Sequence, residues 1–257
     1  MRTNIFFTVT VMVLFSLSVQ SQISLSYEAG FNVGMASFQT DYGERGDFQS
    51  GFSGNMGVAT SASFYINFFG KSGLWNDRAE WISSHMKVKA EVSYMQAKLE
   101  HFGKYVETET SDAEELKAMH GTSSVINTGA ILEYHFMDIY YYNVNRNQTL
   151  DPYIGIGALA TFSKPTFEYD LGDYEANPSI LLPPYQNAIY TDSETTGSLA
   201  FSAGTRIKAT EKSDIVIDSR WQYFFSNKID ALDPEISANK FNDWAYSLTV
   251  GYVFYFN

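Results

Sequence analysis

Seven charged residues lie within segments that are otherwise rich in apolar, aromatic and small side chains. In each segment the charge shares alternate positions with Gly, Ala and Ser, and the intervening positions hold residues such as Val, Ile, Leu, Phe and Tyr. A charge withdrawn from water is costly unless it is paired and hydrogen-bonded. We therefore expect an ion-pair network in the interior, formed by Glu28, Lys89, Glu91, Glu133, Arg206, Asp218 and Arg220.

This network allows two chemical interpretations. Paired charges would fill the interior and leave no open passage, whereas a chain of titratable groups would carry protons or ions. The structural interpretation is favoured because a small barrel leaves room inside for side chains and little else. A tight turn at residues 211–213 predicts that Arg206 lies opposite Asp218 across two neighbouring strands.

Other motifs give little support for enzymatic or cofactor chemistry. Residues 155–160, GIGALA, match the pattern G-x-G-x-x-A, but no helix is expected after them to hold a pyrophosphate. The histidines lack the close spacing of a metal site; they are His85, His101, His120 and His135. We expect no nucleotide, metal or other cofactor and assign no catalytic residue.

A lipid-modifying enzyme is the alternative from a different functional class. Hydrolysis or transfer of acyl chains needs a serine activated by a histidine near the membrane rim. His101 and His120 fall near the expected rim, and the serines nearby are Ser93, Ser111, Ser123 and Ser124. Serine is common in any strand, so we expect no enzyme.

Two loop segments are candidates for binding. Residues 105–116, YVETETSDAEEL, could bind divalent cations and bridge to lipopolysaccharide phosphates, although a solvated loop is the simpler interpretation. Residues 178–190, PSILLPPYQNAIY, carry aromatic side chains that we expect to be exposed. Exposed apolar patches mark interaction sites, so this loop is favoured for contact with a protein partner or ligand.

The elements that must position these residues are strands. Period-two alternation occurs in eight segments: residues 23–37, 58–68, 86–97, 124–136, 153–163, 198–209, 214–225 and 243–257. A Gly-, Ala- and Ser-rich face with few charges suits the interior of a small barrel. Aromatic residues near strand ends suit the girdles of a membrane barrel; they are Trp221, Tyr223, Phe225, Trp244, Tyr246, Tyr252, Phe254 and Phe256.

We therefore predict an all-β fold, an antiparallel up-and-down transmembrane β-barrel of eight strands with long extracellular loops. A soluble barrel with its apolar face inward is the alternative. Surface loops would be residues 38–57, 98–123, 164–197 and 227–242, and periplasmic connections would be 69–85, 137–152 and 210–214. Residues 111–120 should form a short helix capped by Ser111 or Asp112.

The N-terminus and the composition indicate the compartment. Arg2, an apolar run at residues 5–19 and small residues before Gln22 predict a signal peptide at 1–21, followed by one barrel domain at 22–257. The chain has no cysteine, so no disulfide supports it. A net charge of −12 argues against nucleic-acid partners, which need clustered cations.

Four segments resemble a family of outer-membrane β-barrels of Bacteroidota, chiefly flavobacteria. They are FQTDYGERGDF (38–48), KAEVSYMQAKLEHFGKYV (89–106), DSRWQYFFSNKIDALDP (218–234) and NDWAYSLTVGYVFYFN (242–257). The resemblance covers most of the chain after residue 21. It implies a small barrel of the OmpA- and OmpX-like type in the outer membrane, with no established catalytic residues. Asn257 departs from the usual ending, because such barrels finish on an aromatic residue.

The expected function is that of an integral outer-membrane barrel with a plugged lumen. It would act as a structural, interaction or accessory subunit through its surface loops, with loops 38–57 and 164–197 making the recognition contacts. Outer-membrane lipid, lipopolysaccharide and an outer-membrane protein complex are the expected partners. A small channel is a further alternative and would require an empty lumen.

Overall fold

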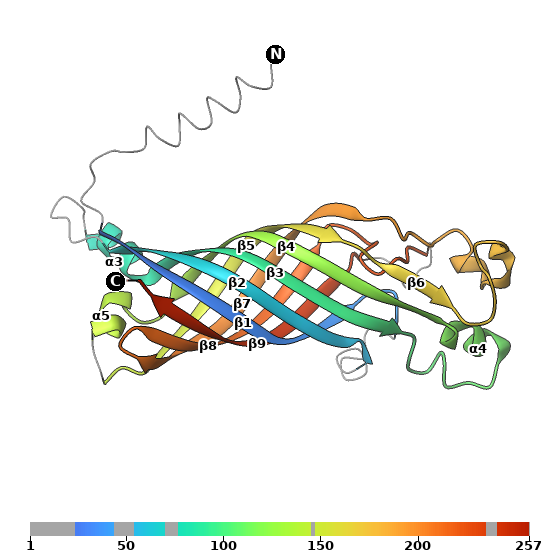
Figure 1. Cartoon of the computed structure of the whole chain (residues 1–257), viewed down its shortest axis with the longest axis horizontal. Helices are drawn as coiled ribbons and strands as arrows, with labels where there is room; N and C mark the ends of the chain where they lie inside the picture. The colour runs from blue at the N-terminus through green and yellow to red at the C-terminus, as the bar shows by residue number, and fades with distance from the viewer. Residues whose placement is uncertain (1–23, 44–53, 70–76, 145–146, 235–240, 257) are drawn as a thin grey trace, which may run out of the picture.

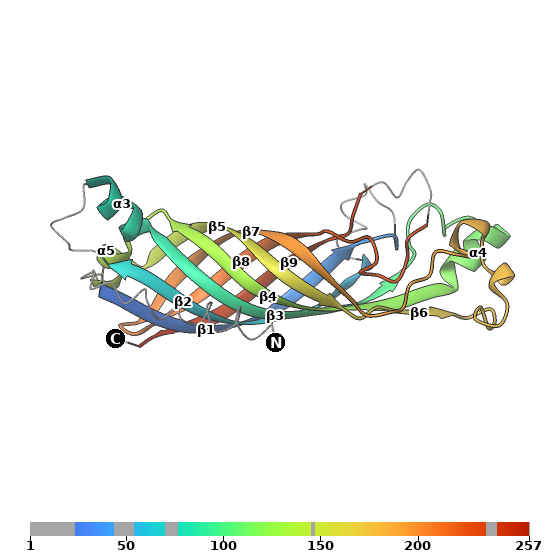
Figure 2. The ribbon, with the colours of Figure 1, turned by 90° about the horizontal axis from the view of Figure 1, so that it is seen from above.

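Eight long strands close into an antiparallel barrel in the computed structural model, which describes residues 24–43, 54–69, 77–144, 147–234 and 241–256 (Figures 1 and 2). The strand order is β3-β2-β1-β9-β8-β7-β5-β4, and pairing of β3 with β4 closes the ring. The predicted fold is therefore confirmed. The predicted signal peptide lies outside the described residues.

Six of the barrel strands are longer than the alternation alone predicted, whereas β8 has the predicted length and β9 is shorter. Their bounds are β1 Ser24–Gln39, β2 Met56–Phe69, β3 Met86–Glu100, β4 Met119–His135, β5 Leu150–Ser163, β7 Glu194–Thr210, β8 Ser213–Phe224 and β9 Trp244–Tyr255. A short ninth strand, β6 Thr166–Tyr169, pairs with the first four residues of β4 and extends the sheet beyond the barrel (Figure 1).

The apolar faces of the strands point outward and the polar faces point inward. Phe31 and Val33 on β1 are 57% and 54% exposed, whereas Glu28 on the same strand is 1% exposed. An eight-stranded barrel has an interior just wide enough for side chains. The soluble alternative, with its apolar side chains inward, is wrong.

The pairing of β7 with β8 differs from the prediction by two residues. Arg206 faces Val216, and Asp218 faces Gly204, so Arg206 does not lie opposite Asp218. The turn contains only two residues between Thr210 and Ser213, and an irregularity between Lys208 and Thr210 shifts the register further. A β-bulge of this kind inserts one extra residue into one strand, which period-two reasoning cannot detect.

Helices lie at both ends of the barrel. Helix α4, Ser111–Lys117, confirms the predicted helix, but its cap is Thr110, whose side chain accepts a hydrogen bond from the Ala113 amide. Sequence analysis missed α3, Asp77–His85, and α5, Ile139–Val144, which lie at the end opposite α4 (Figure 1). Two 3-10 turns, η1 Pro178–Ile180 and η2 Pro183–Tyr185, lie near α4. Among the described residues, no helix is long and apolar enough to cross a bilayer.

Candidate functional site

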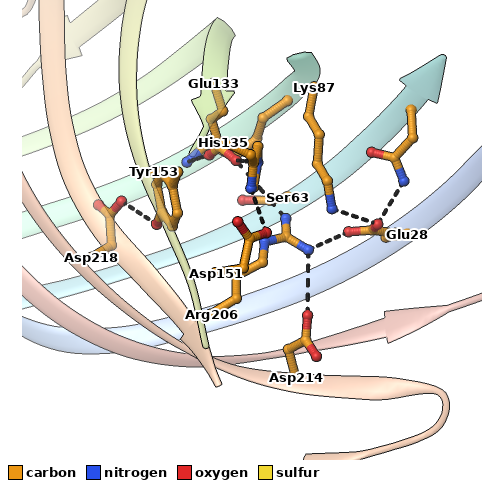
Figure 3. Close-up of polar contacts among 12 residues, drawn as sticks. Glu28, Ser63, Lys87, Glu133, His135, Asp151, Tyr153, Arg206, Asp214 and Asp218 are labelled. Atoms are coloured by element: carbon orange, nitrogen blue, oxygen red, sulfur yellow. Dashed lines mark hydrogen bonds and ion pairs between the residues drawn. The ribbon is translucent and has the colours of Figure 1, made fainter. Parts of the chain in front are cut away.

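The structure buries all seven predicted charges in the lumen. Figure 3 shows four of them, Glu28, Glu133, Arg206 and Asp218. Glu28 from β1 accepts hydrogen bonds from Lys87 Nζ at 2.9 Å and from Arg206 Nη1 at 2.5 Å. These contacts join β1, β3 and β7 across the barrel. Lys87 shares the predicted face but was not included in the predicted network.

A second group of ion pairs continues the network along the barrel axis. Lys89 Nζ lies 2.8 Å from Glu133 and 3.5 Å from Glu91. Arg220 holds Glu91 with both terminal nitrogens, one of them 2.8 Å from Oε2. Paired donors of this kind fix the geometry of a carboxylate as well as neutralising it. Asp218 lies 3.7 Å from Arg220 Nη2, so every predicted member has an oppositely charged neighbour.

The network contains more acids than cations, and neutral donors compensate for the difference. The sequence prediction omitted Asp151 and Asp214. Asp214 accepts from the hydroxyls of Tyr142 and Tyr255. Asp151 lies 2.7 Å from His135 Nδ1. Asp214 is therefore satisfied on both oxygens, whereas Oδ1 of Asp151 is buried without a hydrogen-bond partner.

Aromatic rings also support the cations. The Arg206 guanidinium lies 4.5 Å from the centroid of the Tyr65 ring, and Lys89 Nζ lies 5.9 Å from the same ring. Tyr153 donates to Asp218 at 2.7 Å. The signal for His135 and Asp214 was present in the sequence, because both share the alternate positions of neighbouring predicted members. Asp151 precedes the predicted start of its strand and was missed for that reason.

Toward the other end, the lumen becomes first amide-rich and then apolar. Gln222 Nε2 donates to Asn127 Oδ1 and Ser198 Oγ, each at 2.8 Å, and Thr161 Oγ1 donates to Asn127 at 2.7 Å. Above this layer lies a buried cluster that includes Met95, Leu99, Met119 and Phe224. A cavity of about 10 Å³ lies beside Arg220, about the space that one water needs.

A short segment of the β8–β9 connection is buried at the loop end of the barrel. We call residues 229–232 the mouth plug; its members Ile229, Asp230, Ala231 and Leu232 are all 0% exposed. Ser123 Oγ donates to the Ile229 carbonyl at 2.7 Å, and the Tyr190 amide donates to the Ala231 carbonyl at 2.8 Å. The prediction that residues 227–242 form a surface loop is wrong for this segment, because its apolar side chains complete the buried cluster.

The loop at residues 178–190 is also more buried than predicted. Leu181, Tyr185 and Ala188 are 2%, 8% and 4% exposed, whereas Tyr190 is 39% exposed. The Asp233 amide donates to the Ala188 carbonyl at 2.9 Å, so this loop is joined to the residues that follow the mouth plug. The prediction of exposed aromatic side chains holds at Tyr190 and is wrong at Tyr185.

His101, just after β3, lies in an apolar setting between the segment that follows β1 and the loop at residues 178–190. The His101 ring lies 4.8 Å from that of Tyr42 and 6.1 Å from that of Tyr185. Burial lowers the pKa of His101 to about 4. Burial, assisted by the Asp230 carboxylate, holds the pKa of Tyr42 well above its usual value, and burial raises the pKa of Tyr185 to about 12.

The candidate residues for lipid chemistry make other contacts. His101 Nε2 is buried without a hydrogen-bond partner, and His120 lies 3.3 Å from Glu168. Ser123 donates to the Ile229 carbonyl rather than to a histidine. These contacts give no positive support for hydrolysis. Within the described residues, no group of three or more His, Asp or Glu side chains is placed to hold a metal ion.

The predicted girdle residues fall in two groups on the outer surface. One group lies where β8 ends and β9 begins, where Trp221 pairs with Tyr246 and Tyr223 pairs with Trp244. The other group, at the far end of β9, contains Tyr252, Phe254 and Phe256, which are 36%, 55% and 62% exposed. Leu248 and Val250 lie between the groups and are 40% and 51% exposed. Phe225, just past the end of β8, is 53% exposed.

Comparison with known proteins gives likenesses of structure alone. No protein-family model matches the chain, and no curated protein matches it significantly. A major outer membrane protein from Thermus thermophilus is similar with a TM-score of 0.49 at 9% identity, over 91% of this chain and 100% of that one. Neisserial surface protein A is similar with a TM-score of 0.43 at 12% identity, over 90% of this chain and 98% of that one. The outer membrane protein OprG from Pseudomonas aeruginosa is similar with a TM-score of 0.41 at 12% identity, over 91% of this chain and 95% of that one. Values at this level transfer no activity or ligand to this chain.

Proposed function

We propose that this chain is an integral outer-membrane protein whose sealed barrel is an anchor and whose extracellular loops recognise a partner. In this role it is a structural or accessory subunit rather than an enzyme or a channel. The observation that carries the proposal is the inverted distribution of side chains, with an apolar exterior around an interior of ion pairs.

The exterior supports membrane insertion on energetic grounds. Side chains such as Phe31, Val92 and Ile156 are 57%, 54% and 51% exposed and recur on every second residue of the strands. Each Å² of apolar surface withdrawn from water contributes about 25 cal/mol, so leaving this band hydrated would be costly. Acyl chains cover it without that cost, and the aromatic groups at both ends of β9 suit the two interfaces.

The interior supports an anchor rather than a channel. At the end that we assign to the periplasm, Ile139 and Tyr142 of α5 are both 0% exposed. At the opposite end the mouth plug completes a buried apolar cluster. Between these closures, ion pairs and amides fill the lumen, so no continuous path for hydrated ions is provided.

The extracellular loops support recognition because they are built into an ordered assembly. We call residues 101–118, 164–193 and 226–234 the loop cap; it contains α4, β6, η1 and η2. The cap shares one buried apolar cluster with the loop end of the barrel, yet it exposes Tyr105 at 59%, Leu171 at 60% and Tyr190 at 39%. Exposed apolar side chains on a rigid scaffold are typical of interaction sites.

The acidic part of the cap also provides a contact with the membrane surface. The carboxylates of Glu107, Glu109 and Glu114 are exposed. Divalent cations bound by these carboxylates would bridge them to lipopolysaccharide phosphates, since hard cations prefer oxygen ligands. Lipid and lipopolysaccharide are therefore the expected surroundings, and a protein complex is the expected partner.

Site-specific photocrosslinking in native outer membranes tests the recognition role. A photoreactive residue replaces Leu171 or Tyr190 in the loop cap, and the matched control replaces Tyr141, which is 65% exposed on α5. We expect one protein to be captured in stoichiometric amount from the cap positions and not from the control. Recovery of lipid alone, or of the same proteins from all three positions, would count against the proposal.

A further inference from the structure

A cleft opens at the outer tip of the loop cap, between the connection that follows β3 and the turn η2. Its volume is about 420 Å³, and its walls include Tyr105, Thr108 and Asp112 on one side and Leu182 and Pro183 on the other. This volume lies within the range of small-ligand sites, roughly 300–1,000 Å³. None of the residues that line it belongs to the lumen network or to the mouth plug.

The walls combine an apolar base with a polar rim. Leu116 and Leu182 are partly buried and pack against the apolar cluster that the cap shares with the barrel. The Tyr105 ring is 59% exposed, with Lys104 Nζ 4.9 Å from its centroid. The hydroxyls of Thr108 and Thr110 and the carboxylate of Asp112 supply donors and acceptors. An aromatic platform beside a few convergent polar groups is a recurring composition of binding sites.

Both walls are held in place by local hydrogen bonds. Thr110 caps α4 through the Ala113 amide, and its hydroxyl lies 3.2 Å from that of Thr108. On the other side, the Tyr185 amide donates to the Leu182 carbonyl at 2.8 Å, and Pro183 lies at the start of this turn. A preformed site loses less conformational entropy when a ligand binds.

The charge around the cleft limits the class of ligand. Asp112 lines the cleft and Glu107 and Glu109 are exposed close to it in sequence, whereas Lys104 is the single cation among the lining residues. An excess of carboxylates repels sulfated, phosphorylated and uronic-acid ligands. A neutral ligand with one apolar face and a rim of hydroxyls fits both the charge and the composition.

We propose that this cleft binds a neutral glycan through one or two of its hexose units. The apolar C–H face of a pyranose ring stacks on Tyr105, and its hydroxyls donate to Asp112 and exchange hydrogen bonds with the threonines. This inference rests on the proposed function, since it names the ligand class of the loop cap. The same sugar chemistry occurs in soluble polysaccharides and in glycans linked to lipids.

Binding to an array of oligosaccharides tests the inference with the full-length protein in detergent. The array holds neutral glucans, galactans and mannans beside sulfated and uronic-acid analogues, and vesicles carrying a neutral glycolipid form a second arm. We expect binding to at least one neutral glycan and none to its sulfated analogue. Binding in the array indicates that a free chain suffices, and binding to vesicles alone indicates a lipid-linked source.

Two variants connect the binding to the cleft. Tyr105→Ala and Asp112→Asn should each weaken it at least tenfold, whereas Tyr141→Ala, at the opposite end, should leave it unchanged. Tyr105 is exposed, so its replacement leaves the cap core intact, which amide exchange at the Tyr190 amide verifies. Absence of binding to every neutral glycan in both arms overturns the inference, as does binding that Tyr105→Ala leaves intact. If no neutral glycan binds but a protein is captured by crosslinking from position 171, the inference fails and the proposed function is retained.

Discussion

Arg206 shows at the scale of a single residue how the lumen tolerates charge. Its side chain is 0% exposed, yet it contacts Glu28 at 2.5 Å and lies within 4 Å of both Glu133 and Asp214. The Tyr65 ring covers one side of the guanidinium. Buried charges are stable only in such surroundings, and removal of one partner leaves the others uncompensated.

Replacement of Arg206 should therefore destabilise the barrel strongly. We expect Arg206→Met to lower the free energy of unfolding by about 3–5 kcal/mol, because Glu28 loses its closest cation. Urea titration in lipid vesicles, followed by the gel-mobility difference between folded and unfolded barrels, measures the change. The double variant Arg206→Met with Glu28→Gln should recover part of the loss. Lys117→Met on α4, an exposed position, is the control and should change stability by less than about 0.5 kcal/mol.

His101 makes the stability of the loop cap depend on pH. Its pKa is about 4 in the folded cap and about 6.5 in an unfolded chain, so the unfolded form binds more protons between these values. The neutral histidine supports the cap fully above pH ~6.5, and that support is lost as the pH falls toward ~4. Amide exchange of residues 101–106 should accelerate over this window. His101→Phe should remove the part of this pH dependence that comes from the histidine. If amide exchange in this variant changes with pH as it does in the unmodified protein, His101 is not its cause.

At the scale of elements, the strands were predictable and the closures were not. Alternation identified all eight barrel strands because side-chain period and burial coincide along each of them. The mouth plug and α5 were missed because their burial depends on where the barrel ends, which is a property of the whole fold. Asp151 and the β7–β8 register were missed for local reasons, a strand that begins earlier and a bulge. The seven members of the ion-pair network were predicted from their alternate positions in the strands. Which acid pairs with which cation was not correctly predicted.

The mouth plug should stabilise the loop cap. Ile229→Ala removes a fully buried side chain and should destabilise the cap by about 2–5 kcal/mol through the cavity left behind. Amide exchange at Tyr190, which donates to the Ala231 carbonyl, reports the opening directly. Leu171→Ala is the matched control, since Leu171 is 60% exposed. Equal protection in both variants would show that the plug does not hold the cap.

At the scale of the whole molecule, the proposed function requires a lumen that is closed at both ends and filled between them. The purified protein in planar bilayers should therefore show no steady conductance. Disruption of the mouth plug alone should not open a path for ions, since the ion pairs of β1, β3 and β7 remain. The Ile229→Ala variant should therefore show no steady conductance either. A large, steady conductance of the unmodified protein would contradict the sealed lumen and favour the channel alternative.

The other predictions depend on one property of the barrel. Its apolar exterior contacts lipid, and its charged interior is withdrawn from water. The chain has no cysteine, so single cysteines can carry spin labels at Val33 and Val250, register partners on the outer surface, and at Tyr105 in the loop cap. In reconstituted vesicles, collisions with oxygen, which concentrates in lipid, should dominate at Val33 and Val250. Collisions with a water-soluble nickel complex should dominate at Tyr105. Dominance of the nickel complex at Val33 and Val250 would place this surface in water and contradict the account.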